Sequence, residues 1–152
     1  MMNFHDYLNR QKTEDSRAFI VHCPAKSGKT QFARQAVKTR PDIYCLDLQQ
    51  YFLDRQQSFD QFGFSELKSV LLNLNVGESV VLVDNPDFLF NTWARRDQAG
   101  FANWLKIQLR SPGVTKKTFV FFVQNDPYFE NMDLKNSQGE SRVLPLNAFE
   151  SL

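Results

Sequence analysis

The stretch "AFIVHCPAKSGKT", residues 18–30, decides the fold that this sequence can adopt. Its first half is apolar throughout, which is typical of a strand buried on both faces of a parallel sheet. Its second half matches the phosphate-binding pattern G-x-x-x-x-G-K-[ST] at every position except the first, where Cys23 replaces glycine. Cysteine is small and Pro24 fixes the next φ angle, so we interpret the turn as competent to bind phosphate.

The residues after this turn favour the same interpretation. A helix is expected from residue 28 to about residue 37, and backbone N–H groups at its amino end would converge on an anion. Gly28 would allow close approach of the phosphate, Lys29 would reach the β- and γ-phosphates, and Thr30 would offer its hydroxyl to Mg²⁺. The predicted nucleotide-binding residues are Cys23, Pro24, Ala25, Lys26, Ser27, Gly28, Lys29, Thr30 and Gln31.

A carboxylate at the end of a second buried strand completes the predicted site. The run "SVVLVD", residues 79–84, ends in Asp84, which could hold the water shell of a magnesium ion from a neighbouring strand. Finding both elements in this order is much less expected by chance than finding either alone. We therefore predict Thr30 and Asp84 as the metal-binding residues.

The rest of the chain alternates between apolar strands and amphipathic helices, which predicts one α/β domain over residues 1–152. A five-stranded, mostly parallel sheet with helices on both faces is expected. The predicted strands are 17–23, 42–48, 79–84, 118–125 and 141–146. Helices are predicted at about 3–13, at 28–37 and at 65–74, the last capped by Ser65. A further helix is marked by Phe101, Trp104, Leu105 and Leu109 and ends at Pro112 and Gly113. Residues 49–64 are predicted to be a mixed loop or a broken helix.

Composition limits the partners and the compartment. The net charge is +1, so no bulk attraction to nucleic acid is built in. Direct DNA binding is possible but not indicated by this charge, and the aromatics and arginines of residues 84–104 are candidate contacts. No run approaches the roughly 20 apolar residues of a membrane span. The two cysteines have no metal-binding spacing and indicate a reducing cytoplasm. His22, inside a buried strand, is predicted to be a hydrogen-bonded interior residue rather than a metal ligand.

The order of these elements resembles AAA-type and related P-loop ATPases over about residues 17–147. The resemblance implies a three-layer P-loop NTPase fold that binds ATP or another NTP with Mg²⁺. It implies that Asn125, or alternatively Gln124, senses the γ-phosphate. It also makes Arg142 of the "SR" pair a candidate finger for a neighbouring subunit's nucleotide, the alternative being a surface arginine. The predicted catalytic residues are Lys29, Asp84, Asn125 and Arg142.

Two departures from that family set the expected activity. Asn85 stands where a water-activating glutamate is usual, and Asn cannot accept a proton, so hydrolysis should be slow or partner-dependent. Asp87 and Asp47 are the alternative bases. The helical lid is also expected to be absent, so a neighbouring protein would complete the site.

The size and layout are similar to the BrxF family of small P-loop proteins in BREX phage-defence islands. That similarity implies a cytoplasmic component that assembles, depending on nucleotide, with itself or with other defence proteins. An active ring ATPase acting on DNA and a nucleotide-free scaffold are the alternatives, and a small-molecule kinase is disfavoured by the missing lid.

Overall fold

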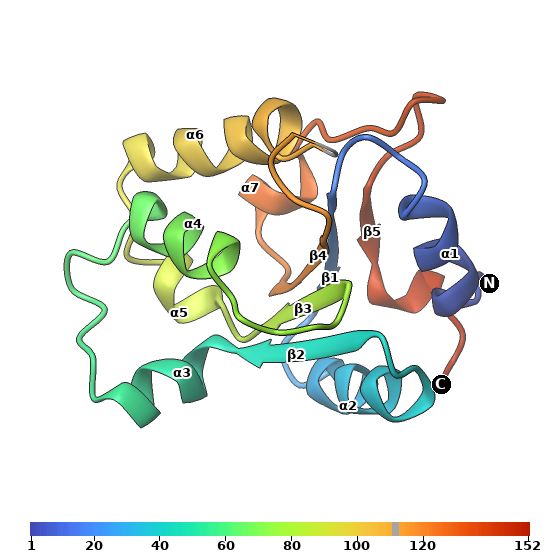
Figure 1. Cartoon of the computed structure of the whole chain (residues 1–152), viewed down its shortest axis with the longest axis horizontal. Coiled ribbons are helices and arrows are strands. Elements are labelled where there is room, and N and C mark those ends of the chain that lie inside the picture. The colour runs from blue at the N-terminus through green and yellow to red at the C-terminus, as the bar shows by residue number, and fades with distance from the viewer. Residues whose placement is uncertain (111–112) are drawn as a thin grey trace.

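The computed structural model describes residues 1–110 and 113–152 and shows a three-layer α/β domain (Figure 1). A five-stranded sheet has the order β2-β3-β4-β1-β5, and every neighbouring pair is parallel. The strands are β1 (Ala18–Cys23), β2 (Ile43–Asp47), β3 (Val80–Asp84), β4 (Thr118–Gln124) and β5 (Val143–Pro145). The prediction of a mostly parallel sheet is confirmed, and in the described residues the sheet is parallel throughout.

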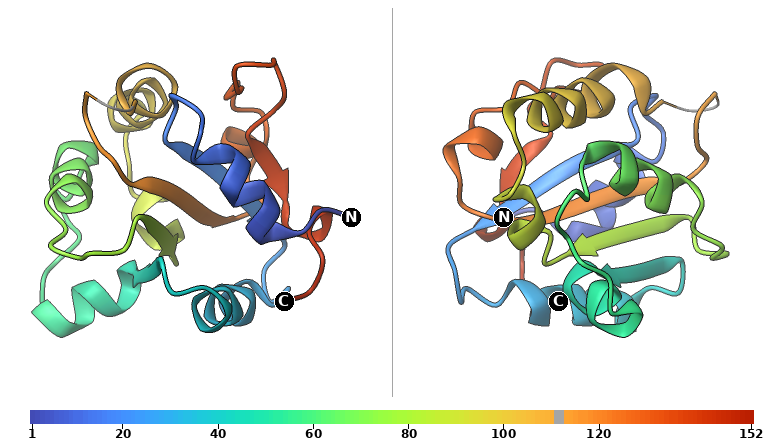
Figure 2. Two further views of the ribbon diagram at one scale, coloured as in Figure 1. Left: turned by 45° about the vertical axis from the view of Figure 1, so that its right-hand side comes forward. Right: turned by 90° about the vertical axis from the view of Figure 1, so that its left-hand side faces the viewer.

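Helices connect the strands and cover both faces of the sheet (Figure 2). The helices are α1 (Phe4–Gln11), α2 (Lys29–Thr39), α3 (Leu48–Arg55), α4 (Phe64–Leu72), α5 (Asp87–Phe90), α6 (Arg95–Asn103) and α7 (Pro127–Glu130). A π-helical turn, η1 (Trp104–Gln108), continues α6, and a 3₁₀ turn, η2 (Leu146–Ala148), follows β5.

Alternation along the strands divides the core into two layers. Phe19 and Val21 of β1 pack on one face with side chains from α1 and α2. Ala18 and Ile20 pack on the other face with side chains from α3 to α7. Most of the aromatic residues lie in these layers, where Phe4 and Phe101 each contact several other rings edge-on.

The structure refines two local predictions, and a third falls outside the described residues. The segment predicted as a broken helix forms α3 and then a loop. Ser65 does not cap α4, because the helix begins one residue earlier: Gly63 is the N-cap and its N–H donates to the Glu66 carboxylate over 2.9 Å. The predicted helix end at Pro112 lies outside the described residues.

Parallel pairing brings the carboxyl ends of the strands to one edge of the sheet. Cys23, Asp47, Asp84 and Gln124 each end a strand, so they share the carboxyl edge of the sheet. In open parallel sheets this edge is where ligands usually bind. Within the described ranges, no helix combines the length and apolar character that crossing a bilayer requires.

Candidate functional site

The connection from β1 to α2 is a turn with left-handed backbone. Lys26 has φ 60° and Gly28, the N-cap of α2, has φ 90°. The Ser27 hydroxyl donates to the Pro24 carbonyl over 2.6 Å and closes the turn. A Cβ built on Gly28 would meet no atom within 4 Å, so the space beside the glycine is open. The amino end of α2 therefore presents unpaired N–H groups to that space without a side-chain cap.

Lys29 and Asp84 meet directly at this amino end. Lys29 Nζ donates to Asp84 Oδ1 over 2.7 Å, and the residues are only 9% and 1% exposed. The Thr30 hydroxyl donates to the other carboxylate oxygen, Oδ2, over 3.1 Å. The two elements predicted from separate motifs thus form one cluster, with both oxygens of Asp84 hydrogen-bonded.

Asn85 adds a neutral acceptor to the cluster. Its φ of 54° turns the chain sharply after β3, and its side-chain oxygen accepts a hydrogen bond from Lys29 Nζ over 3.1 Å. A residue with left-handed backbone is uncommon unless it is glycine, asparagine or aspartate, and strain of this kind gathers at functional sites.

Of the two carboxylates considered as alternative bases, Asp87 lies in the cluster. Its Oδ2 is 3.9 Å from Lys29 Nζ, and its Oδ1 accepts from the Gln124 backbone N–H over 2.8 Å. Burial raises the pKa of Asp87 above its usual value, despite these favourable contacts. Asp47 pairs with Asp84 across β2 and β3, but its carboxylate caps α3 by accepting from the Gln50 N–H over 3.2 Å.

The residue after β4 reaches the same turn. Asn125 donates its backbone N–H to the Cys23 carbonyl over 2.8 Å, and its side-chain Oδ1 lies 2.9 Å from His22 Nδ1. Its side chain is exposed and borders a cavity. Gln124, the other predicted sensor, does not border that cavity, so Asn125 is the better placed of the two.

A cavity of about 650 Å³ opens beside the turn, within the size range of small-molecule sites. It is bordered by the turn, by His22 and Asn125, by one side of α2 and by segment 145–152. Met2 holds that last segment in place, because its N–H donates to Ala148 and its carbonyl accepts from Glu150. This wall could not be foreseen, because it depends on contact between segments distant in sequence.

The described residues contain no cluster of three or more His, Cys, Asp or Glu side chains able to hold a metal alone. Thr30 and Asp84 would therefore supply two oxygen ligands, and the others would have to come from water or a bound phosphate. Mg²⁺ is usually bound in this way, by one or two protein oxygens together with substrate phosphates. The donor set fits magnesium under that condition.

Arg142 contradicts the prediction of an arginine finger. Its side chain is completely buried, and the described residues offer its guanidinium no hydrogen-bond partner. Burial lowers the pKa of Arg142 to about 10. Its backbone pairs with Leu134 and Ile20, which fixes the residue inside its own chain and out of reach of a neighbouring subunit.

Of the aromatic residues that directly follow β3, Phe90 and Trp93 belong to the core, whereas Phe88 is half-buried. Leu89, Phe90 and Trp93 are buried, and the Trp93 indole donates to the Phe62 carbonyl over 3.0 Å. Arg95 and Arg96 are exposed. The buried rings are therefore unavailable for stacking on bases.

Comparison with protein-family models, with curated proteins and with solved structures yields no match. The assignment of a function therefore depends on the geometry of this site.

Proposed function

We propose that the protein binds a nucleoside triphosphate with Mg²⁺ at the carboxyl edge of its sheet, in a P-loop type of site, with ATP as the first candidate. One observation carries the proposal: Lys29 and Asp84 pair over 2.7 Å at the amino end of α2, beside a turn whose backbone is left-handed at residues 26 and 28. Helix amino ends and such turns attract anions, and a buried lysine supplies the matching charge.

The pairing in the free protein also suggests how Lys29 responds to a ligand. A buried ion pair loses much of its attraction to desolvation, so Lys29 can exchange partners at modest cost. Lys29 would turn from Asp84 to the phosphate, while Asp84 and Thr30 would hold the magnesium ion. The ion would supply charge neutralisation for the phosphates.

The residues around Lys29 support binding more strongly than turnover. Asn85 cannot accept a proton. Asp87 is the carboxylate whose raised pKa suits a base, although in the free protein it is engaged by the Gln124 N–H. We therefore propose a nucleotide-dependent switch with slow or partner-dependent hydrolysis.

The biological role that we propose follows from the family resemblance alone. It is a cytoplasmic assembly or regulatory component of a BREX-like phage-defence system, acting as a homo-oligomer or with other defence proteins. The burial of Arg142 removes the residue expected to act across a ring, which disfavours the alternative of a ring ATPase on DNA.

Lys29→Ala tests the site, and Lys12→Ala is its matched control. Lys12 forms a lysine–aspartate pair of similar length, 2.9 Å to Asp42, away from the turn. Calorimetry with Mg-ATP should show an affinity at least about 100-fold lower for Lys29→Ala, because charge-assisted bonds to phosphate are lost. Lys12→Ala should bind like the wild type.

Equal affinity of Lys29→Ala and the wild type would disprove the assignment of the turn. Failure of the wild-type protein to retain nucleotide at millimolar Mg-ATP would favour the scaffold alternative instead.

A further inference from the structure

We propose that His22 is a positioning residue for the phosphate site: it holds the side-chain amide of Asn125 so that the amide donates hydrogen bonds into the cavity beside the turn. The inference rests on the proposed function and adds a residue that the sequence motif does not contain. Its basis is the contact between His22 Nδ1 and Asn125 Oδ1 at 2.9 Å.

The chemistry of the two groups fixes the direction of this hydrogen bond. An amide oxygen can only accept, so Nδ1 of His22 carries the hydrogen and donates it. Among the described residues, His22 is the one hydrogen-bond partner of the Asn125 side chain. The Nδ2 group of Asn125 thus keeps both of its hydrogens for an anion in the cavity.

The backbone of Asn125 is already fixed, so the side-chain rotation is what His22 controls. The Asn125 N–H donates to Cys23, the first residue of the turn, over 2.8 Å, which extends the pairing of β1 with β4. Asn125 is exposed, whereas the His22 side chain is only 14% exposed, and both residues border the cavity. An exposed amide without His22 would rotate freely and lose entropy on binding.

Glu130 of α7 lies near the same ring nitrogen, with Oε1 3.8 Å from Nδ1. That distance is too long for a hydrogen bond, but the negative carboxylate favours a hydrogen on Nδ1. If the imidazole were removed, the same carboxylate would attract the Asn125 amide hydrogens away from the cavity. His22 therefore holds the amide oxygen close to a carboxylate that would otherwise compete for the amide hydrogens.

A packing role alone would not require histidine at this position. The other residues of β1 are all apolar and buried, so leucine would suit the strand at least as well as imidazole. His22→Leu is thus expected to fold, while it removes the donor to Asn125. His22→Gln restores a donor in a side chain of similar reach.

The experiment compares the affinity of Mg-ATP for the wild type, His22→Leu, His22→Gln and Asn125→Ala by calorimetry. His22→Leu should bind about tenfold more weakly, as expected for losing one oriented bond to a charged group. His22→Gln should recover most of the loss. In the double variant His22→Leu/Asn125→Ala the two losses should not add, because both remove the same hydrogen bond.

Three results would overturn the proposal: no loss in His22→Leu, no recovery in His22→Gln, or losses that add in the double variant. If His22→Leu does not fold, as judged by thermal unfolding, His22→Ala takes its place in the same comparison. If wild-type protein binds no Mg-ATP, the site assignment fails and this proposal with it. If Lys29→Ala loses binding while the His22 variants keep it, only the present inference is wrong.

Discussion

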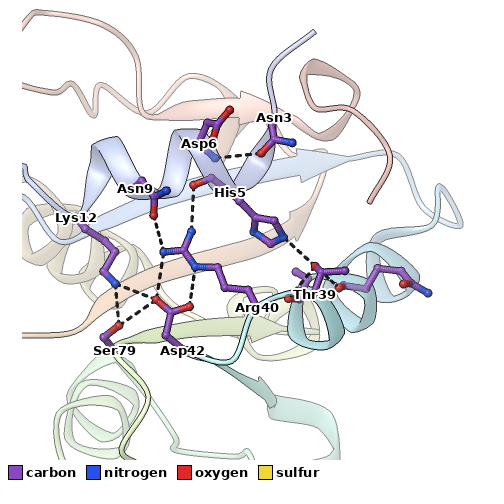
Figure 3. Close-up of polar contacts among 11 residues, drawn as sticks. Asn3, His5, Asp6, Asn9, Lys12, Thr39, Arg40, Asp42 and Ser79 are labelled. Atoms are coloured by element: carbon purple, nitrogen blue, oxygen red, sulfur yellow. Dashed lines mark hydrogen bonds and ion pairs between the residues drawn. The ribbon is translucent and has the colours of Figure 1, made fainter.

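The two edges of the sheet carry nearly identical ion pairs in different settings. At the carboxyl edge Lys29 donates to Asp84 over 2.7 Å, and at the amino edge Lys12 donates to Asp42 over 2.9 Å. Figure 3 shows the second setting, where α1 lies against the starts of β2 and β3. The surroundings of each pair, rather than the pair itself, decide whether it belongs to a binding site or only stabilises the fold.

At the amino edge one carboxylate satisfies two cations. Asp42 accepts from Arg40 Nε over 2.6 Å and from Lys12, whose Nζ also donates to the Ser79 hydroxyl over 3.0 Å. Arg40 donates further to the His5 carbonyl and to the Asn9 side chain, which ties α1 to the rest of the domain (Figure 3). These side chains point toward one another, and none of them borders the cavity beside the turn.

At the carboxyl edge the ratio of cations to carboxylates is reversed. Lys29 faces two carboxylates, Asp84 and Asp87, and the backbone is left-handed at Lys26, Gly28 and Asn85. Strained turns and an excess of buried charge reduce stability, and they persist where a ligand compensates for them. We therefore expect substitutions at the amino edge to change stability, and those at the carboxyl edge to change binding.

The largest stability effect should come from Asp42→Asn. The variant leaves Arg40 and Lys12 without their shared carboxylate, and the free energy of unfolding should fall by about 2 kcal/mol. Urea unfolding measures the loss, and calorimetry with Mg-ATP should show unchanged affinity. A drop in nucleotide affinity without loss of stability would show that the amino edge also affects binding, which contradicts the assignment of different roles to the two edges.

The pH dependence of that loss follows from the Asp42 carboxyl. Desolvation opposes its ionisation, but hydrogen bonds from Arg40 and Lys12 outweigh this and hold the pKa of Asp42 well below its usual range. The contribution of Asp42 to the free energy of unfolding is therefore fully present above its pKa in the unfolded chain, about 4, and is lost as the pH falls below that value. The difference in unfolding free energy between wild type and Asp42→Asn should shrink below about pH 4.

The sequence predicts the sheet best, because the position of each strand constrains where the residues at its ends lie. Continuous apolar runs predict buried parallel strands, and parallel strands bring Lys29 and Asp84 to the same edge of the sheet. The fold class, the five strands and the meeting of Lys29, Thr30 and Asp84 were predictable for this reason. The prediction that the strand of Asp84 neighbours the strand before the turn is wrong, because β4 lies between β1 and β3.

Residues whose role depends on tertiary contacts could not be predicted in the same way. Arg142 precedes a short edge strand, and nothing in "SRVLPL" shows that its side chain turns inward. His22 and Asn125 lie 103 positions apart and meet only through the pairing of β1 with β4. The cavity wall at 145–152 is set by Met2, at the far end of the chain.

A smaller effect is expected for Gly28→Ala. Alanine at φ 90° costs about 1 kcal/mol or somewhat more, but its Cβ would meet no atom, so the domain should still fold. The methyl group would occupy the space where we place the phosphate, and Mg-ATP affinity should fall.

Gly139→Ala is the matched control, because Gly139 has φ 80° and equally open surroundings on an exposed loop. Both variants should lose similar stability in urea, whereas only Gly28→Ala should lose affinity. Equal affinity in the two would mean that the glycine serves the turn alone.

The smallest effect should come from His5, which joins α1 to α2 through a 2.8 Å contact between its Nε2 and the Thr39 hydroxyl (Figure 3). Burial, and then the charge of Arg40, lower the pKa of His5, although Asp42 and Asp6 act in the opposite direction. The unfolded chain therefore binds a proton at this position more readily than the folded one, and stability falls as the pH drops through the unfolded value of about 6.5. In His5→Gln, which cannot titrate, urea unfolding between pH 7 and pH 5 should lose less stability than in the wild type. If the unfolding free energies of the two proteins change equally with pH, protonation of His5 does not affect stability. The pH dependence of the amino edge would then come from Asp42.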